Sequence, residues 1–410
     1  MDLFLELIQV ALGQKDRLSR TPSEEDWQSL FQMAEEQAIT SFVFPALEIL
    51  NKCGQKPPVE LLLEWIGLAE QDRSQNELMN SEAARLTALF ENEGHRTAIL
   101  KGQANARLYN CHTEPMEQRE QNHVSHELCR VATEEDDSQI TESTERVATT
   151  LLRLPGDIDI WVSGGKERVV QTLRKLHLID GGISKYLSAE KALDGYHHIH
   201  LPKNEKGVDV EVHFRPSSGN HDPFTNRRLQ KYLNQEIERE NELVGEGFRV
   251  PSIRFALVMQ LAHIQRHALE TGIELRRVID YYYLLKSDAD HERETIKGKL
   301  KEMGLDHIAG ALMWVMKEVL LMDEGWMIAK PDEKRGRILL DIIMGGDHFG
   351  FISAKNQQTF SFVRSLMYHI RKFELLRFDA RETIWSELNY YGNFMTSIPE
   401  RIRRSSWTLR

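Results

Sequence analysis

A Pro-Gly turn followed by a segment that alternates acidic and apolar residues places the tightest restriction on the fold. The segment reads Leu154-Pro155-Gly156-Asp157-Ile158-Asp159-Ile160-Trp161-Val162. Successive side chains of a β-strand point to opposite faces, so the two aspartates share one face and the two isoleucines share the other. Adjacent carboxylates repel each other and are costly to bury without a partner. Either they face solvent on an edge strand, or a divalent cation pairs with them, because hard cations bind carboxylate oxygens.

The composition is that of an ordinary globular protein with a sizeable core. The chain has 410 residues, 41% of them hydrophobic and 28% charged, and this length allows about two or three domains. A net charge of −11 argues against broad, non-specific nucleic-acid binding, which requires a positive surface. The three cysteines (Cys53, Cys111 and Cys129) form no CxxC pair, which favours a reducing cytoplasm over a disulfide framework. Since no segment resembles a secretory signal or a membrane span, we expect a cytoplasmic protein with no membrane partner.

Helical patterns on both sides of a central region predict an α+β protein in three parts. Residues 1–94 should form an N-terminal helical region, and residues 251–410 a C-terminal helical region. Residues 95–250 contain the strand patterns and should form a small mixed β-sheet core with helices packed on it. Within this core, residues 111–152 are rich in Ser, Thr, Gln and Glu, which predicts an exposed insertion. The helices expected in the flanking regions include 57–68, 72–93, 251–270 and 275–285.

Two further strand patterns flank the Asp157–Asp159 segment. Residues 97–100 predict a strand, followed by a Lys101-Gly102 turn and a helix to about Tyr109. Free backbone N–H groups at such a turn can bind phosphate. Residues 196–201 and 208–214 predict a hairpin whose loop contains a glycine. Each strand of this hairpin has polar side chains on one face: His198 and His200 on the first, and Asp209, Glu211 and His213 on the second.

Motifs of several enzyme classes are missing. The sequence contains neither GxxxxGK[ST] nor GxGxxG, so it predicts neither a P-loop nor a Rossmann nucleotide site. His263 and His267 are one helical turn apart, but no glutamate lies between them, so we do not expect an HExxH metalloprotease.

What remains is an ordered set of a Lys-Gly turn, an Asp-x-Asp strand and a third carboxylate on a neighbouring strand. Three carboxylates on adjacent strands can hold two divalent cations, which activate an attacking hydroxyl and neutralise a leaving pyrophosphate. Phosphoryl and nucleotidyl transfer depend on such positioning and charge neutralisation more than on covalent help from the protein.

The order of these motifs is similar to that of a known family. The similar segments are Ile99 to Gly102, Arg153 to Val162, Val210 to Phe214 and Leu261 to Asp280. Over roughly residues 95–285, apart from the insertion, the chain resembles the uncharacterised nucleotidyltransferase family within the DNA polymerase β-like nucleotidyltransferase superfamily. The resemblance implies transfer of a nucleoside monophosphate from an NTP to an acceptor of unknown kind, which could be a small molecule, a protein or RNA.

The resemblance also implies roles for individual residues. Asp157, Asp159 and Glu211 would be the catalytic carboxylates that bind Mg²⁺ or Mn²⁺, with Asp209 competing for the third position. The residues expected to contact the nucleotide are Lys101, Gly102, Gln103 and Arg153. Gln103 departs from the superfamily, which usually has Gly-Ser after the first strand, so a phosphate-contacting hydroxyl is missing.

Alternative functions remain open at this point. The departure at Gln103 would suit a catalytically degenerate protein that binds a nucleotide or a partner on the same fold. The histidines of the hairpin would suit a zinc hydrolase. The candidate cleft residues are His213, His263, His267, Arg276 and Asp280, and the last four could instead form a buried polar network between the helices and the sheet.

Overall fold

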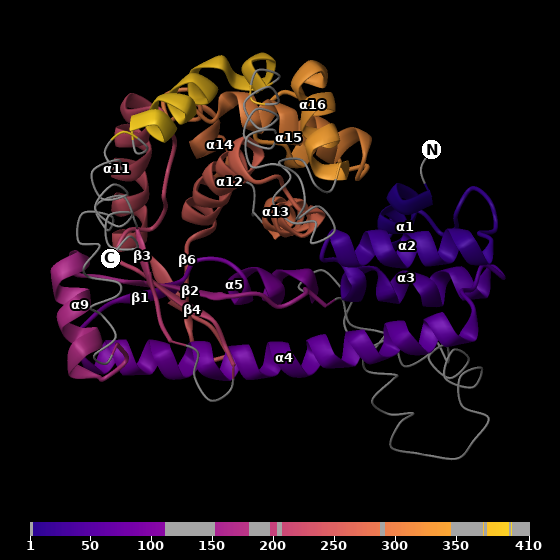
Figure 1. Cartoon of the computed structure of the whole chain (residues 1–410), viewed down its shortest axis with the longest axis horizontal. Coiled ribbons are helices and arrows are strands. Elements are labelled where there is room, and N and C mark those ends of the chain that lie inside the picture. The colour runs from indigo at the N-terminus through magenta and orange to yellow at the C-terminus, as the bar shows by residue number, and fades with distance from the viewer. Residues whose placement is uncertain are drawn as a thin grey trace, which may run out of the picture.

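The structure is a computed structural model with the α+β architecture expected from the sequence. In Figure 1 a small sheet lies between the long helix α4 (Val59–Asn92) and the helices α12 (Ile253–Glu270) and α13 (Leu275–Ser287). The residues described are 3–110, 152–179, 197–202, 207–287, 292–345, 372, 375–392 and 395. The expected insertion, except for its last residue, and residues 203–206 of the expected hairpin loop at 203–207 lie outside these ranges.

The N-terminal part of the chain is helical, as predicted. Its helices are α1 (Leu3–Ala11), α2 (Glu24–Glu36), α3 (Thr40–Lys52) and α4. The start of α2 is fixed by a capping box, in which the Ser23 hydroxyl accepts from the Asp26 backbone and the Asp26 carboxylate accepts from the Ser23 backbone. The prediction of separate helices at 57–68 and 72–93 was wrong, because α4 is one helix of 34 residues. The residues between the two predicted helices are helix formers, and no proline interrupts them.

The mixed sheet has the strand order β1-β2-β4-β3. Its strands are β1 (Thr97–Ile99), β2 (Ile158–Val162), β3 (His198–His200) and β4 (Val210–His213). β1 pairs with β2 and β3 pairs with β4 in antiparallel fashion, whereas the central pair β2–β4 is parallel. A parallel pair needs a crossover connection, and that connection includes α9 (Gly165–Lys175). The predicted strands and hairpin are confirmed, although the observed strands are shorter.

One face of the sheet is closed by apolar packing. Ile158 and Ile160 of β2 and Val212 of β4 are buried in one cluster with Phe90 of α4 and Leu173 of α9. Burial of each such side chain stabilises the fold by about 1.5–3 kcal/mol. Because side chains alternate along a strand, the intervening residues of β2 and β4 point to the opposite face.

The remainder of the chain adds helices above the sheet and along its edge (Figure 1). They are α11 (Pro223–Arg239), α12, α13, α14 (Glu292–Lys297), α15 (Asp306–Glu318), the 3₁₀ turn η2 (Glu324–Trp326), α16 (Glu333–Met344) and a helical segment at 375–392. Among the residues described, no helix combines the length and apolar character that crossing a bilayer requires.

Two short elements differ from the sequence-based expectation. Residues 241–251, where the sequence predicted no strand, form a small antiparallel sheet of β5 (Asn241–Leu243) and β6 (Arg249–Pro251). Strands of three residues are too short to give a recognisable alternating pattern. The single helix expected after Gly102 is instead a short helix, α5 (Gln103–Ala106), followed by the 3₁₀ turn η1 (Arg107–Asn110).

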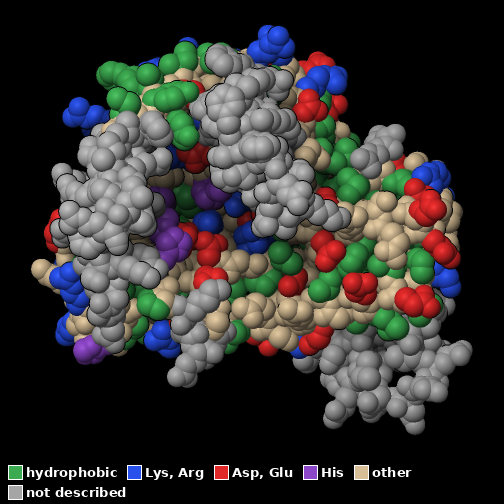
Figure 2. All heavy atoms as spheres, viewed as in Figure 1, with side chains coloured by type: hydrophobic (Ala, Val, Ile, Leu, Met, Phe, Trp, Pro, Cys, Tyr) green, Lys and Arg blue, Asp and Glu red, His purple; other side chains and the backbone are tan. Residues whose placement is uncertain are grey.

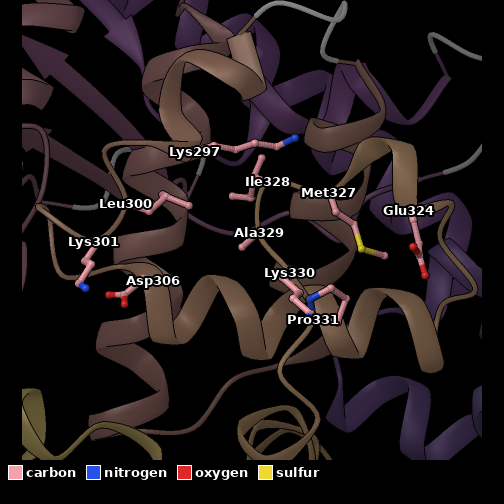
Figure 3. Close-up of a pocket in the computed structure, with 10 residues that line it drawn as sticks. All are labelled: Lys297, Leu300, Lys301, Asp306, Glu324, Met327, Ile328, Ala329, Lys330 and Pro331. Atoms are coloured by element: carbon pink, nitrogen blue, oxygen red, sulfur yellow. The ribbon is translucent and has the colours of Figure 1, made fainter.

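A cavity of about 560 Å³ lies in the C-terminal part of the chain (Figure 3). Its lining residues are Lys297, Leu300, Lys301, Asp306, Glu324, Met327, Ile328, Ala329, Lys330 and Pro331. None of them belongs to the sheet, so this cavity is separate from the carboxylates of β2 and β4.

Candidate active site

Pairing of the two central strands places the predicted carboxylates side by side. Asp159 of β2 lies opposite Glu211 of β4 in the parallel register, and Asp157 immediately precedes β2. Asp159 is 1% exposed, whereas the side chains of Glu211 and Asp157 are 16% and 39% exposed. Asp209 lies just before β4 and is exposed, so Glu211 is the carboxylate that the sheet holds against Asp159.

The Lys101 ammonium lies between the two aspartates. Its Nζ is 3.0 Å from Oδ2 of Asp159 and 3.7 Å from Oδ2 of Asp157. The turn that carries Lys101 is attached to β2, because the Leu100 N–H donates to the Asp159 carbonyl at 2.9 Å. The sequence-predicted turn and the Asp-x-Asp strand are therefore in direct contact.

Gly102 is required at the next position by its backbone conformation. Its φ is +64°, a region that residues with a side chain rarely occupy. A Cβ at this position would also be 3.3 Å from the Asp157 carbonyl oxygen. The glycine therefore lets the turn approach the start of β2.

Burial and neighbouring charges act differently on the two aspartates. Burial alone would raise the pKa of Asp159, but Lys101 and His213 outweigh this effect and hold that pKa below its ordinary value. The pKa of Asp157 is raised by burial and by the charge of Asp159. Burial opposes the charge of Lys101, but the two aspartates outweigh it and raise the pKa of the ammonium. The Lys101–Asp159 pair is therefore charged at neutral pH.

Histidines surround the carboxylates on the side away from Lys101. Nε2 of His213 is 2.9 Å from Oδ1 of Asp159 and 3.3 Å from Oε2 of Glu211. On the neighbouring strand, Nδ1 of His198 and Nδ1 of His200 are each 3.5 Å from an oxygen of Glu211. The polar side chains of the two hairpin strands, which the sequence predicted for each strand, therefore lie on the same face of the sheet as Asp159.

A further histidine, His197, was not singled out by the sequence analysis. Its ring centroid is 4.5 Å from that of His198 and 5.0 Å from that of His213. Strict alternation would turn it away from His198, but it lies just before β3, where alternation does not hold. Burial lowers the pKa of both His197 and His198, so both rings are neutral at pH 7. Burial opposes charge on His213 as well, but its bonds to Asp159 and Glu211 raise that pKa.

The helices α12 and α13 contribute basic and imidazole side chains opposite the carboxylates. Burial strongly lowers the pKa of His263 and of His267, and the charge of Lys101 lowers both further. The ring centroids of these two histidines are 4.4 Å apart. Arg277 contributes to the same lowering of both pKa values. Sequence reasoning selected Arg276, whereas the charge that acts on these two histidines is that of Arg277, whose Nη1 is 3.2 Å from Oε2 of Glu274.

Arg153, Asp280 and Arg276 form a buried network beside the site. Nε and Nη2 of Arg153 donate to both oxygens of Asp280 at 2.8–3.0 Å. Tyr109 donates its hydroxyl to the same carboxylate at 2.8 Å. Arg276 donates from Nη1 to the carbonyls of residues 154 and 155 at 3.3 and 3.1 Å. The sequence left open whether the polar residues of these helices line a cleft or form a buried network. These contacts place Arg276 and Asp280 in the network.

The Gln103 side chain is directed to α4. It is 2% exposed, and its amide donates to Oδ1 of Asn80 at 2.7 Å. In this orientation the amide does not replace the hydroxyl that a serine would supply to a phosphate. A contribution of Gln103 to nucleotide binding would come from its backbone.

The charged groups gather at a hollow that is open to solvent. Figure 2 shows histidine, basic and acidic side chains meeting in this hollow, over the sheet and below α12 and α13. The donor set fits a divalent cation, because candidate ligand atoms of Asp159, Glu211 and His213 lie within 4.8 Å of one another and the Lys101 ammonium lies between Asp159 and Asp157.

Comparison with known proteins identifies the family of the chain. The model of a family described as "Uncharacterised nucleotidyltransferase" matches residues 23–114 and 147–334. These ranges include the Lys101 turn, β2, β4 and the helices α12 and α13. Searches of curated proteins and of solved structures give no match. From its sequence order, its sheet and this match over most of its length, the chain belongs to the uncharacterised nucleotidyltransferase family.

Proposed function

We propose that the protein transfers a nucleoside monophosphate from an NTP to an acceptor, with a divalent cation bound by Asp157, Asp159 and Glu211. The observation that carries this proposal is the position of Lys101, whose ammonium lies between two carboxylates that would otherwise repel each other. The two aspartates need a positive charge, which Lys101 supplies here and which Mg²⁺ or Mn²⁺ would supply through the same carboxylate oxygens.

Each residue of the site has a defined part in this proposal. When bound, the cation would polarise the phosphate that is attacked and neutralise charge on the leaving pyrophosphate. Lys101, displaced from the carboxylates, would pair with phosphate oxygens, and Gly102 would let the backbone approach them. His213 would hold Asp159 and Glu211 in place through its two contacts. Arg277 would add positive charge on the opposite wall.

The orientation of Gln103 favours a second candidate function. Because its amide is bonded to α4, the site lacks the phosphate-contacting hydroxyl found in the wider superfamily. A protein that binds an NTP and senses it without transfer would tolerate this loss. The two candidates share the carboxylate site and differ in turnover.

The test compares a double variant, Asp157→Asn with Asp159→Asn, with the matched control Asp209→Asn. The control removes an exposed carboxylate from the residue before β4. Binding of Mg²⁺·NTP would be measured by calorimetry, and transfer by incubation of cell extract with NTP labelled at the α-phosphate. We expect the double variant to lose binding and transfer and the control to retain both. Binding without transfer by the wild-type protein would favour the sensor, and equal binding by the double variant would refute both candidates.

A further inference from the structure

A second group of metal-ligating side chains lies at the edge of the sheet, next to the acidic site. His198 and His200 share one face of β3, and Glu211 of β4 lies opposite His200 in the antiparallel register. The candidate ligand atoms of these three residues all lie within 4.8 Å of one another. Two imidazoles and a carboxylate are a different donor set from the three carboxylates of the proposed nucleotide site.

The spacing of these atoms fits a small transition-metal ion. Both Nδ1 atoms are 3.5 Å from oxygens of Glu211, and the Nε2 atoms of His198 and His200 are 3.0 Å apart. Ligands at about 2.0–2.1 Å from a tetrahedral zinc ion are about 3.3 Å from one another. Because Nδ1 of each ring faces Glu211 while the short distance between the rings joins their Nε2 atoms, the rings would rotate so that each presents one nitrogen to a common ion.

The surroundings of Glu211 support the same interpretation. His213 is 5% exposed, and its Nε2 is 3.3 Å from Oε2 of Glu211, the oxygen that His198 also approaches. Carboxylates that bind metal ions are usually held in this way by a neighbouring hydrogen-bonding group. The Nδ1 atom of the buried His213 has no hydrogen-bond partner among the described residues. Since Nε2 of the same ring faces Glu211, the support for the site is the contact that holds Glu211 and not this Nδ1 atom.

We propose that His198, His200 and Glu211 bind Zn²⁺ or a similar first-row transition-metal ion. Imidazole nitrogens favour such ions, whereas Mg²⁺ favours oxygen ligands. Three protein ligands leave the fourth position open, and the His200 side chain is 62% exposed, so water can reach it. The site shares Glu211 with the proposed nucleotide site, and its two imidazole ligands belong to it alone.

The test uses Co²⁺ as a spectroscopic probe and Zn²⁺ as a competitor, on the full chain. The variant His198→Asn with His200→Asn removes the imidazole ligands. The matched control is His177→Asn, because His177 is exposed and has a φ of +53°, which asparagine tolerates. We expect visible Co²⁺ absorption in the wild-type protein and the control, removed by Zn²⁺. The double histidine variant should bind Co²⁺ at least about 100-fold more weakly, since even partners of ligands contribute about 10–100-fold.

The outcome separates this site from the proposed function. The Asp157→Asn, Asp159→Asn variant should retain Co²⁺ binding while losing Mg²⁺·NTP, and the histidine variant should do the reverse. Circular dichroism of the histidine variant checks that the sheet is still folded. Equal Co²⁺ affinity of the wild-type protein and the histidine variant would overturn the proposal, whatever the result with NTP.

Discussion

The Asp280→Asn substitution should destabilise the protein strongly, because it leaves a buried cation without its counter-charge. Arg153 and Asp280 are 6% and 4% exposed, and Arg153 makes three contacts of 2.8–3.0 Å with the carboxylate. Burial alone would lower the pKa of Arg153, but Asp280 outweighs it and raises that pKa. Loss of one partner from a buried pair costs about 3–5 kcal/mol. Since folded proteins are stable by about 5–15 kcal/mol, this is a large share of the total.

The measurement is urea-induced unfolding followed by tryptophan fluorescence. The matched control is Glu333→Gln, which breaks the exposed pair with Arg337, whose two side chains are 66% and 67% exposed. That change should lower the free energy of unfolding by less than about 1 kcal/mol. Replacement of the buried pair with Arg153→Met and Asp280→Leu should recover much of the loss, since apolar side chains of similar volume often substitute for a buried ion pair.

Two results would refute this reasoning. If Asp280→Asn unfolded at the same urea concentration as the wild-type protein, the buried pair would not stabilise the fold. If the same variant were as stable as the wild-type protein but bound Mg²⁺·NTP more weakly, the pair would serve nucleotide binding and not stability. The second result would support the role that the sequence resemblance implied for Arg153.

Two further substitutions test the pH response and the glycine turn. Burial raises the pKa of Glu382 to about 7, so its contribution to stability is complete below about pH 4.5 and is lost as pH rises through about 7. In the wild-type protein, the free energy of unfolding should therefore fall by up to about 3 kcal/mol between about pH 5 and pH 8. The Glu382→Gln variant should lack this fall, and urea unfolding at each pH measures it. Gly102→Ala should cost about 1–3 kcal/mol through its positive φ and also weaken Mg²⁺·NTP binding. In the control Gly272→Ala, φ is +91° and the added Cβ would meet no atom within 4 Å, so this variant should lose stability through strain alone. If Gly102→Ala bound Mg²⁺·NTP as tightly as Gly272→Ala, the role of Gly102 would be contradicted.

The sequence allowed the sheet and the acidic part of the site to be predicted because those features are local. Alternation in residues 157–162 and 208–214 placed Asp159 and Glu211 on strand faces, and the parallel pairing of β2 and β4 then joined them. The edge strand β3 was also predicted, but its contact with Glu211 depends on the antiparallel register.

The features that the sequence did not predict depend on tertiary contacts. The 34-residue length of α4 requires that a polar stretch remain helical between two apolar ones. The position of Gln103 depends on the presence of Asn80 on that helix. Arg276 and Arg277 are adjacent in sequence and chemically identical, and they differ only in what each one faces after α13 has packed.

The helix α13 joins the stability of the fold to the geometry of the site. Arg276 holds the two carbonyls just before Gly156, and Asp280 holds Arg153 a few residues earlier. Both contacts fix the segment that delivers Asp157 to the start of β2. The next residue, Arg277, carries its charge toward Lys101 and the histidines of α12. Residues 276 and 280 can therefore influence nucleotide binding without touching the nucleotide, because any shift of α13 moves an aspartate and a positive charge of the site together.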